Sequence, residues 1–333
     1  MVNSTCKGKL LKLVAGAGVA AIAFFPSADT TANAVESQRV SIQFEGAVGS
    51  EPFACGETYR VGTEDSAITP LDFRLYVSEV ALIDAAGNTV PVVLEQDGLW
   101  QHQNVALLDF EDKTGSCANG TPETRAEVVG AVPAGDYSGL KFTLGVPFAL
   151  NHIDSTLAPS PLNLTSLWWN WNFGYKFARV DMEPVNETAM AETGIPEIGV
   201  TETGISEIGV AEIGVTETSV DATKETHSST SAQAFAIHIG SVGCQMDAAE
   251  PPVNCSSPHR ADVMFTDFDP AQDVVVTDLS ALVANTNLNE NQEGTPIGCM
   301  SGIDDNDCMG IMQSLGLPFQ DQPETEQTFF RVK

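Results

Sequence analysis

The residues with the clearest chemical potential are one tryptophan and two histidines in two short segments. Trp100 and His102 lie two positions apart in DGLWQHQ (97–103), and His152 ends the segment FALNH that starts at position 148. In a strand, residues two apart point to one face with α-carbons about 6.5 Å apart, so Trp100 and His102 could share one small ligand. Neutral imidazole is a common metal ligand, which makes this a candidate metal site. From spacing alone, a core aromatic and two hydrogen-bonded histidines are the more common interpretation.

Two other places could bind a metal ion. His238 alternates with the apolar residues of FAIHI (235–239), so it faces away from them and serves as a reserve ligand. Near the C-terminus, Asp304, Asp305 and Asp307 offer the oxygen atoms that Ca2+ prefers. An exposed acidic turn is the commoner explanation of such a cluster.

An aromatic run, WWNWNFGY (168–175), offers a different kind of site. At strand spacing Trp169, Trp171 and Phe173 share one face, which favours a place in the core. The same rings could instead form a platform for sugars. A calcium-stabilised β-sandwich module for adhesion or glycan binding is therefore the alternative function.

The charge and the missing motifs exclude several classes of protein. The chain has 15 Lys+Arg against 45 Asp+Glu, a formal net charge of −30. A surface this acidic repels phosphate backbones and anionic headgroups, so we expect no nucleic-acid binding. The sequence contains no HExxH, GxSxG or P-loop motif. An enzyme built on the histidines and a bound metal remains a third hypothesis.

The N-terminus has the features of a secretory signal peptide. Lys7, Lys9 and Lys12 precede an apolar run (13–25), and Ala32-Asn-Ala34 provides small residues for cleavage. The run is shorter than the ~20 residues that a spanning helix needs, so we expect no membrane span. Residues 1–34 are therefore interpreted as the signal peptide, and residues 35–333 as a single domain that is periplasmic, secreted or on the outer surface.

Six cysteines remain after cleavage, and in an exported chain an even number indicates three disulfides. The spacing favours two local pairs and one longer one: Cys244–Cys255, Cys299–Cys308 and Cys55–Cys117. No cysteine lies in a CxxC or CxxCH pattern, so the ligand spacing of thioredoxin-like redox sites and covalently bound haem is absent.

Short alternating segments separated by Gly, Pro, Asn and Asp predict strands. Val40-Ser-Ile-Gln-Phe44 and Leu140-Lys-Phe-Thr-Leu144 have the two-residue period of half-buried strands. The apolar residues change parity near Ser78 and Glu79, which predicts a bulge in that strand. Val90–Leu94 is expected to return as its partner. The fold class is therefore all-β, an antiparallel β-sandwich or barrel-like fold with long loops.

One segment differs from this pattern. From about 183 to 230 the chain is acidic and repetitive: AETGIPEIGV (191–200) is followed by TETGISEIGV (201–210). Such a composition offers little apolar area to offset ordering entropy, so we interpret it as a disordered insertion. A short β-solenoid is the alternative.

Taken together, the ordered motifs resemble one known family. The carrying segments are DFRLYVSEVALIDAAGNTVPVVL (72–94), GLWQHQNVALLDFEDKTGSCANGT (98–121), GLKFTLGVPFALNHIDSTLAPSPLNLTSLWWNWNFGYKF (139–177), FAIHIGSVGC (235–244) and GCMSG (298–302). They resemble the MbnP-like family of exported copper-binding proteins, whose relatives include the surface copper proteins CorA and MopE. The resemblance spans nearly the whole mature chain outside the insertion.

The resemblance implies a specific metal site. In this family a tryptophan in a Trp-x-His pattern is oxidised to kynurenine, which binds Cu(I) together with two histidines. Carried over, Trp100 matches the oxidised tryptophan, His102 the first histidine and His152 the second, with His238 in reserve. The oxidant implied is a MauG-like diheme cytochrome peroxidase-type protein, MbnH. The chain itself is then the substrate of that oxidase, acts in copper handling and is not an enzyme.

Overall fold

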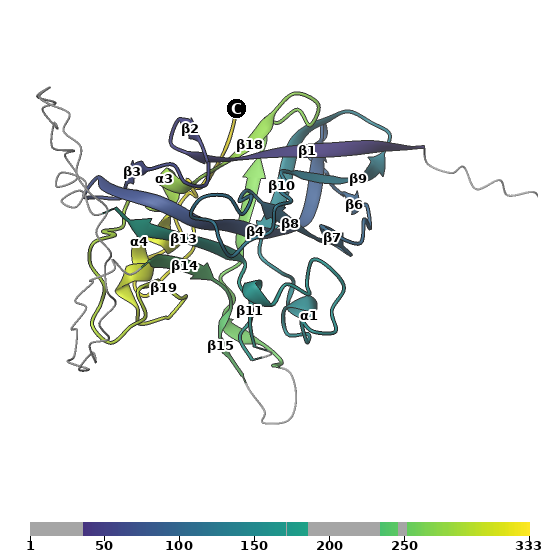
Figure 1. Ribbon diagram of the computed structural model, residues 1–333. Coiled ribbons are helices and arrows are strands. Elements are labelled where there is room, and N and C mark those ends of the chain that lie inside the picture. Colours follow the sequence, from purple (N-terminus) through teal and green to yellow (C-terminus); the bar gives the residue numbers. More distant parts are fainter. Residues whose placement is uncertain (1–35, 171, 186–233, 246–251) are drawn as a thin grey trace, which may run out of the picture. The chain divides into compact units, whose positions relative to one another are not determined.

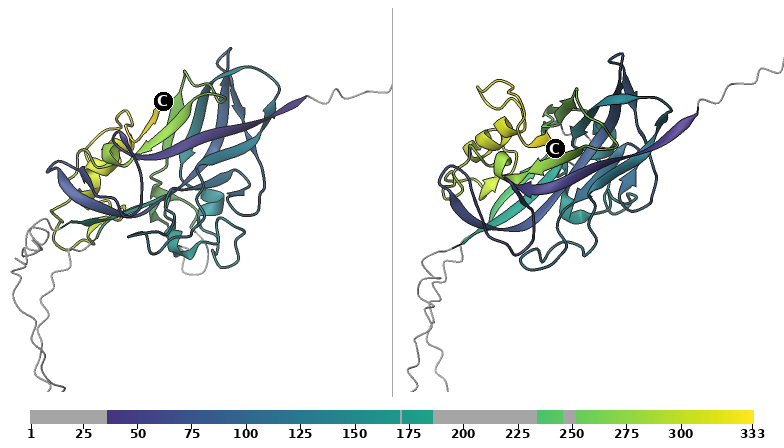
Figure 2. Two further views of the ribbon diagram at one scale, coloured as in Figure 1. Left: turned by 45° about the horizontal axis from the view of Figure 1, so that its top comes forward. Right: turned by 90° about the horizontal axis from the view of Figure 1, so that it is seen from above.

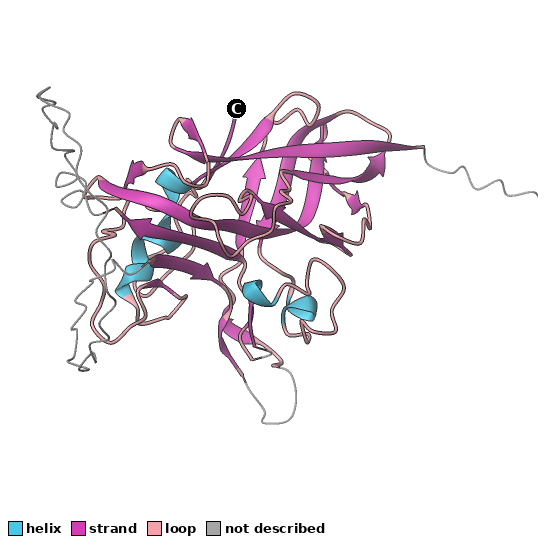
Figure 3. Ribbon diagram, in the orientation of Figure 1, coloured by secondary structure: helices cyan, strands magenta, loops and turns pink. Residues whose placement is uncertain are grey.

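Strands dominate the part of the chain that the computed structural model describes, residues 36–170, 172–185, 234–245 and 252–333 (Figure 1). The expected signal peptide and nearly all of the expected insertion lie outside these residues. The helices are short: α1 (Phe148–Asn151), α3 (Leu279–Leu282) and α4 (Met309–Ser314), with 3-10 turns at Thr165–Leu167 and Asn306–Cys308 (Figure 3). None of these described helices has the length and apolar character to cross a membrane.

The first sheet has the strand order β20-β18-β1-β9-β6, with β2 paired to β1. Its long strand β1 buries Ile42 and Phe44 and exposes Gln43, as its two-residue period predicts. The strands of this sheet are β1 (Ser37–Val48), β2 (Glu51–Pro52), β6 (Val93–Leu94), β9 (Glu127–Pro133), β18 (Val274–Asp278) and β20 (Phe330–Val332).

The second sheet has the order β17-β10-β4-β13-β14-β19, with β3, β5 and β8 also paired to β4 and β7 paired to β8. Its strands are β3 (Tyr59–Val61), β4 (Ser66–Asp84), β5 (Thr89–Pro91), β7 (Gln101–His102), β8 (Val105–Asp109), β10 (Tyr137–Leu144), β13 (Ala178–Pro184), β14 (Phe235–Ile239), β17 (Ala261–Phe265) and β19 (Gly298–Cys299). Two separate hairpins are β11 (Trp168–Asn170) with β12 (Gly174–Tyr175), and β15 (Val242–Cys244) with β16 (Cys255–Ser257).

The predicted bulge is present in β4. Lys141 of β10 pairs with Ala81 and Thr143 pairs with Ser78, so β4 has one extra residue between these two pairs. Glu79 adopts a left-handed φ of 55° there. The bulge confirms the change of parity in the sequence, because it lets apolar residues on both sides of it face the core.

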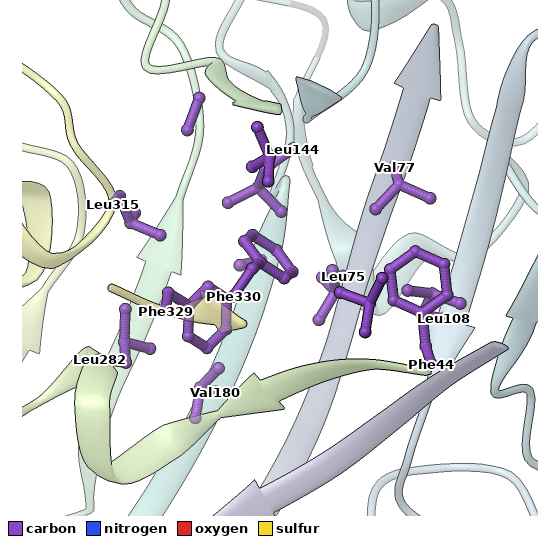
Figure 4. Packing of buried hydrophobic residues seen from close by; sticks show 14 of the residues in the cluster. Phe44, Leu75, Val77, Leu108, Leu144, Val180, Leu282, Leu315, Phe329 and Phe330 are labelled. Carbon is purple, nitrogen blue, oxygen red and sulfur yellow. The ribbon is translucent and has the colours of Figure 1, made fainter. Parts of the chain in front are cut away.

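The two sheets pack face to face around the main core. Phe44 of β1 contacts Phe142 of β10 with ring centroids 5.6 Å apart, and β1 runs across the second sheet in Figures 1 and 2. Figure 4 shows Leu75, Phe329 and Phe330 meeting in the same core from β4 and the C-terminal strand region. This burial of apolar side chains from both layers is the main stabilising contribution to the fold.

A second, smaller apolar cluster lies outside the main core. Its buried members are Tyr76, Val105, Leu107, Val146, Leu162, Leu167, Tyr175 and Phe177. Since Tyr76 alternates with Leu75 and Val77 of the main core, strand β4 is buried on both faces. The loops after β10 and the segment around Trp100 cover this second cluster.

The expectation of an all-β sandwich with three disulfides is confirmed, and the sheets do not close into a barrel. Two details differ from a purely antiparallel arrangement. Strand β18 pairs parallel with β1, and β19 pairs parallel with β14. Long connections separate each of these pairs in the chain, which is what parallel pairing requires.

The expected return strand 90–94 divides between the two sheets. Strand β5 pairs with β4 in the second sheet, whereas β6 pairs with β9 in the first. The prediction that residues 90–94 form one strand paired with β4 is therefore wrong for the second half of the segment. Val92 N still donates to Val80 O at 2.9 Å, so the chain leaves the second sheet only after this residue.

Candidate functional site

The turn before Trp100 is organised by one carboxylate. Asp97 Oδ1 accepts hydrogen bonds from the backbone N–H groups of Leu99, Trp100 and Gln101 at 2.8–3.0 Å. Burial raises the pKa of Asp97, but these three bonds and the charge of Arg125 outweigh it, so the net pKa is lowered. Gly98 takes the left-handed φ of 73° that the turn needs. The sequence Asp-Gly thus fixes where strand β7 begins.

Gln101 determines which way its two neighbours face. The side chain of Gln101 is buried and donates to Glu95 O and Val129 O, while its Oε1 accepts from Val129 N, all at 2.8 Å. Val129 belongs to the first sheet, so Gln101 points toward that sheet. Because side chains alternate along a strand, His102 of β7 is on the side opposite to Gln101, while Trp100, the residue before β7, packs against the second apolar cluster.

The loop that carries His152 is attached to this turn. Ser160 Oγ donates to Leu99 O at 2.7 Å. Trp100 packs against the second apolar cluster, and so do Leu150 and Ile153, the apolar residues nearest His152. The structure therefore brings the Trp100 turn and the segment around His152 to one apolar cluster.

His152 itself is buried at the end of α1. Its ring lies 5.0 Å from the ring of Phe148, and its Nε2 is 3.2 Å from Asn151 Nδ2. Asn151 Oδ1 accepts from Tyr175 N at 2.9 Å, which turns the Asn151 amide nitrogen toward the imidazole. Nε2 must then accept the hydrogen bond, so this nitrogen carries a lone pair rather than a proton.

His102 is half-buried beside the following turn. Its Nε2 lies 3.1 Å from Gln103 Nε2, and Gln103 has a left-handed φ of 53°. Gln96 holds this turn, since its Oε1 accepts from Gln103 N at 2.6 Å. His102 is thus positioned by the backbone of a tight β7–β8 connection.

Clusters of metal-ligating atoms are few in the described residues. Groups of three or more His, Cys, Asp or Glu with ligand atoms within 4.8 Å of one another are His152–Cys244–Cys255 and Cys55–Glu111–Cys117. Two members of each group form a disulfide, so neither group offers a thiolate in the oxidised protein. The three disulfides join the pairs that the sequence spacing favours.

The reserve ligand His238 has a different environment. Register places Arg74, Arg179 and His238 side by side on β4, β13 and β14. His238 Nε2 lies 2.8 Å from Asp181 Oδ1. Burial lowers the pKa of His238, and the hydrogen bond with Asp181 offsets this only in part. These contacts are those of a hydrogen-bonded core histidine, and they give the reserve role no support.

Arg74, at the end of the row formed with Arg179 and His238, also belongs to a group of buried charges that the sequence did not predict. Arg74 is buried against Asp72 and lies 3.9 Å from Glu111. Burial raises the pKa of Asp109 to about 8, even though the Arg74 charge opposes the shift. The signal was present in DFR (72–74), where charged residues two apart flank an apolar one and must share a strand face.

The acidic residues proposed for Ca2+ serve local contacts. Asp305 accepts from Asp307 N at 3.1 Å and precedes the 3-10 turn, and burial raises its pKa. Asp307 Oδ2 accepts from Gln292 N at 2.9 Å. Asp304, Asp305 and Asp307 do not appear among the converging ligand groups of the described chain. Calcium binding there stays a prediction.

The aromatic run forms a hairpin rather than one strand. Asn170 Oδ1 accepts from Asn172 N and Phe173 N at 2.9 and 3.1 Å, which closes the turn between β11 and β12. Phe173 is 43% exposed, so its expected place in the core is wrong. Trp171 lies outside the described residues. Trp169 and Phe173 line a surface cavity together with Met300 and Ile303.

The donors near Trp100 fit a soft ion of low coordination number. His102 lies on β7 two residues after Trp100, and His152 lies in the neighbouring loop, where an ion would have to displace Asn151 Nδ2 from its Nε2. Imidazole suits copper, while hard ions such as Ca2+ prefer several oxygen ligands. An intact indole has no in-plane lone pair to give, so Trp100 becomes a ligand only after chemical change.

Comparisons with known proteins agree with this description. The MbnP family model matches residues 37–301. The solved structure of MbnP from Methylosinus trichosporium is 28% identical in sequence, with a TM-score of 0.70, and the match covers 90% of this chain and 99% of that one. No curated protein matches the chain significantly. The likeness therefore extends over most of the chain, and the matched range contains the segments of Trp100, His102 and His152.

Proposed function

This chain belongs to the MbnP family, and we propose that it is an exported copper-binding protein that acts in copper handling. Cu(I) is held by His102, His152 and a kynurenine made from Trp100. The observation that carries this proposal is the Ser160–Leu99 hydrogen bond, with one apolar cluster joining the Trp100 turn to the His152 loop.

Oxidation of Trp100 supplies the missing ligand. Two equivalents of peroxide, used by the partner enzyme, supply the four-electron oxidation: the C2–C3 bond of the indole breaks, C2 and C3 each gain one oxygen atom to give N-formylkynurenine, and two waters are released. One water then hydrolyses the formamide, so C3 remains as a ketone, C2 leaves as formate and the aromatic amine is freed. The amine and the ketone have lone pairs that the indole lacks. In the proposed site His102 faces the same side as Trp100, as their two-residue spacing predicts, so the new donors form beside an existing imidazole without a change in the backbone.

The oxidant comes from another protein. The sequence has no CxxCH haem-attachment motif, so this chain is the substrate of a partner and not the catalyst. We propose the diheme peroxidase-type protein MbnH as that partner, with peroxide as its oxidant. The net charge of −30 favours encounter with a basic patch on the partner, and this attraction weakens as salt rises.

Co-expression tests the proposal. Mature protein made with its diheme partner is digested, and its peptides are analysed by mass spectrometry. The peptide containing Trp100 is expected to carry the mass change of kynurenine. Trp169→Phe is the matched control, because Trp169 lies in the β11–β12 hairpin and its loss should leave the modification of Trp100 unchanged. An unmodified Trp100, together with unchanged Cu(I) affinity in His102→Ala and His152→Ala, would rule the site out.

A further inference from the structure

A disulfide lies directly against one of the candidate ligands. His152 Nε2 is 3.5 Å from Cys255 Sγ, and the ligand atoms of His152, Cys244 and Cys255 all lie within 4.8 Å of one another. The lone pair of this nitrogen accepts a hydrogen bond from Asn151 Nδ2, which an ion bound to Nε2 would displace. Two sulfur atoms and one imidazole nitrogen thus lie close enough to bind one ion. The sulfur atoms are joined in a disulfide, and reduction would convert them to thiolate ligands.

The hairpin holds the two sulfur atoms together independently of their bond. Cys244 of β15 and Cys255 of β16 are register partners, and Val242 pairs with Ser257 beside them. Gln245 N also donates to Asn254 O at 2.9 Å on the other side of the pair. Cross-strand partners have β-carbons about 5 Å apart, so the two cysteines stay within reach of one ion after the disulfide opens.

Cys244–Cys255 is also the most accessible of the three disulfides. Both of its cysteines are half-buried, whereas Cys299 and Cys308 are fully buried. The remaining pair has one buried member, Cys117. Because exchange needs access of a thiolate to sulfur, a reductant reaches the hairpin pair first.

We propose that reduction of Cys244–Cys255 creates a metal site of two thiolates and His152 Nε2 for a soft d10 ion such as Cu(I). A dithiol reductant gives two electrons and two protons to the disulfide and itself becomes a disulfide. Metal binding then releases the two thiol protons, because the thiolate is the ligand. Thiolate ligands select Cu(I) over harder ions.

This site goes beyond the proposed function, since it shares His152 but needs neither Trp100 nor His102. The two sets of ligands therefore compete for one imidazole. Reduction of the hairpin draws the ion toward the thiolates, and oxidation returns His152 to the set around Trp100. Reduction thus acts as a redox switch on the position of the ion.

The experiment uses the mature protein, a limited amount of phosphine reductant, and Cd2+ as the probe. Alkylation and mass mapping identify the pair that opens, and Cd2+ titration reports thiolate coordination through charge-transfer absorption in the ultraviolet. We expect Cys244 and Cys255 to be alkylated first and the band to saturate at one ion per chain. The oxidised protein and Cys244→Ser/Cys255→Ser show no band.

Two further variants separate this site from the copper site proposed above. His152→Gln is expected to weaken Cd2+ binding by at least about tenfold, because loss of even an outer-shell partner costs about that much. Trp100→Phe/His102→Ala leaves it unchanged while abolishing the proposed copper site. Opening of Cys299–Cys308 before the hairpin pair, or Cd2+ binding that is indifferent to His152→Gln, overturns the inference. Loss of binding in Trp100→Phe/His102→Ala assigns the ion to the other site and overturns it as well.

Discussion

Ser160 Oγ donates a hydrogen bond of 2.7 Å to Leu99 O, across 61 positions of the sequence. Leu99 immediately precedes Trp100, and Ser160 belongs to the loop that follows His152. The bond therefore connects the two segments that must cooperate if one ion is to contact both. It is a contact between loops, and neither residue is a candidate ligand.

Ser160→Ala is expected to weaken Cu(I) binding by up to about tenfold, since one hydrogen bond contributes roughly 0.5–1.5 kcal/mol. Competition with a Cu(I) chelator measures the effect. Thr156→Ala is the matched control: Thr156 Oγ1 lies 2.7 Å from Asp154 Oδ1 in the same loop and has no hydrogen bond to the Trp100 turn among the described contacts. Equal affinity in the two variants would contradict a positioning role for Ser160.

Gln101→Leu is expected to destabilise the fold by about 2 kcal/mol, because it leaves the buried Val129 N–H without its acceptor. The change replaces the amide by an apolar group of similar size, so the loss reports hydrogen bonding more than volume. Urea unfolding measures it. Gln103→Leu serves as the control, since Gln103 is exposed in the next turn. A free energy of unfolding unchanged in Gln101→Leu would show that β7 does not depend on this anchor.

Asp109 predicts a specific dependence of stability on pH. Burial raises its pKa in the folded state from 3.8 to about 8, so the folded protein binds the proton more tightly than the unfolded chain. Its contribution to stability is fully present below the unfolded pKa and is lost as pH rises from about 4 to about 8.

Asp109→Asn imitates the protonated carboxyl at every pH. The melting temperature of Asp109→Asn minus that of the wild type is therefore expected to increase as pH rises to about 8. Above that pH the difference stays constant. Thermal melts of both proteins across this range test the assignment. A constant difference throughout would mean that Asp109 is ionised in the folded protein.

The sequence allowed prediction of the parts of the fold that follow from local patterns. Alternation located β1 and β10, and the change of parity near Ser78 located the bulge. The parallel pairing of β18 with β1 could not be predicted, because it depends on which distant strand completes an edge. Likewise the turn in the aromatic run is set by hydrogen bonds of Asn170, which strand spacing cannot reveal.

For the candidate site too, the local pattern could be predicted from the sequence and the contacts between distant segments could not. The two-residue period in Trp100-Gln-His102 predicts a shared face for Trp100 and His102, and this stays a prediction. The structure shows that Gln101 between them is anchored to Glu95 O and Val129 O. Contacts between loops have no periodic signal. The bond from Ser160 to Leu99 and the approach of Cys255 to His152 both join segments far apart in the chain, so only the folded structure reveals them.

The acidic repeat is expected to be dispensable for folding and for copper binding. Strands β13 and β14 flank it and pair antiparallel from Ala178↔Ile239 to Met182↔Phe235, so the described strands on either side of it are already neighbours in one sheet. A short turn can join such neighbours, as in any two-stranded hairpin. None of the candidate ligands belongs to residues 186–233.

The test replaces residues 186–233 by an Asn-Gly turn with short flanks. We expect the melting temperature and the Cu(I) affinity to stay close to those of the full chain. Solubility at low salt is expected to fall, because the repeat carries many of the acidic residues that keep copies of the chain apart. A deletion variant that folds but no longer binds Cu(I) would instead assign the repeat a direct part in metal binding.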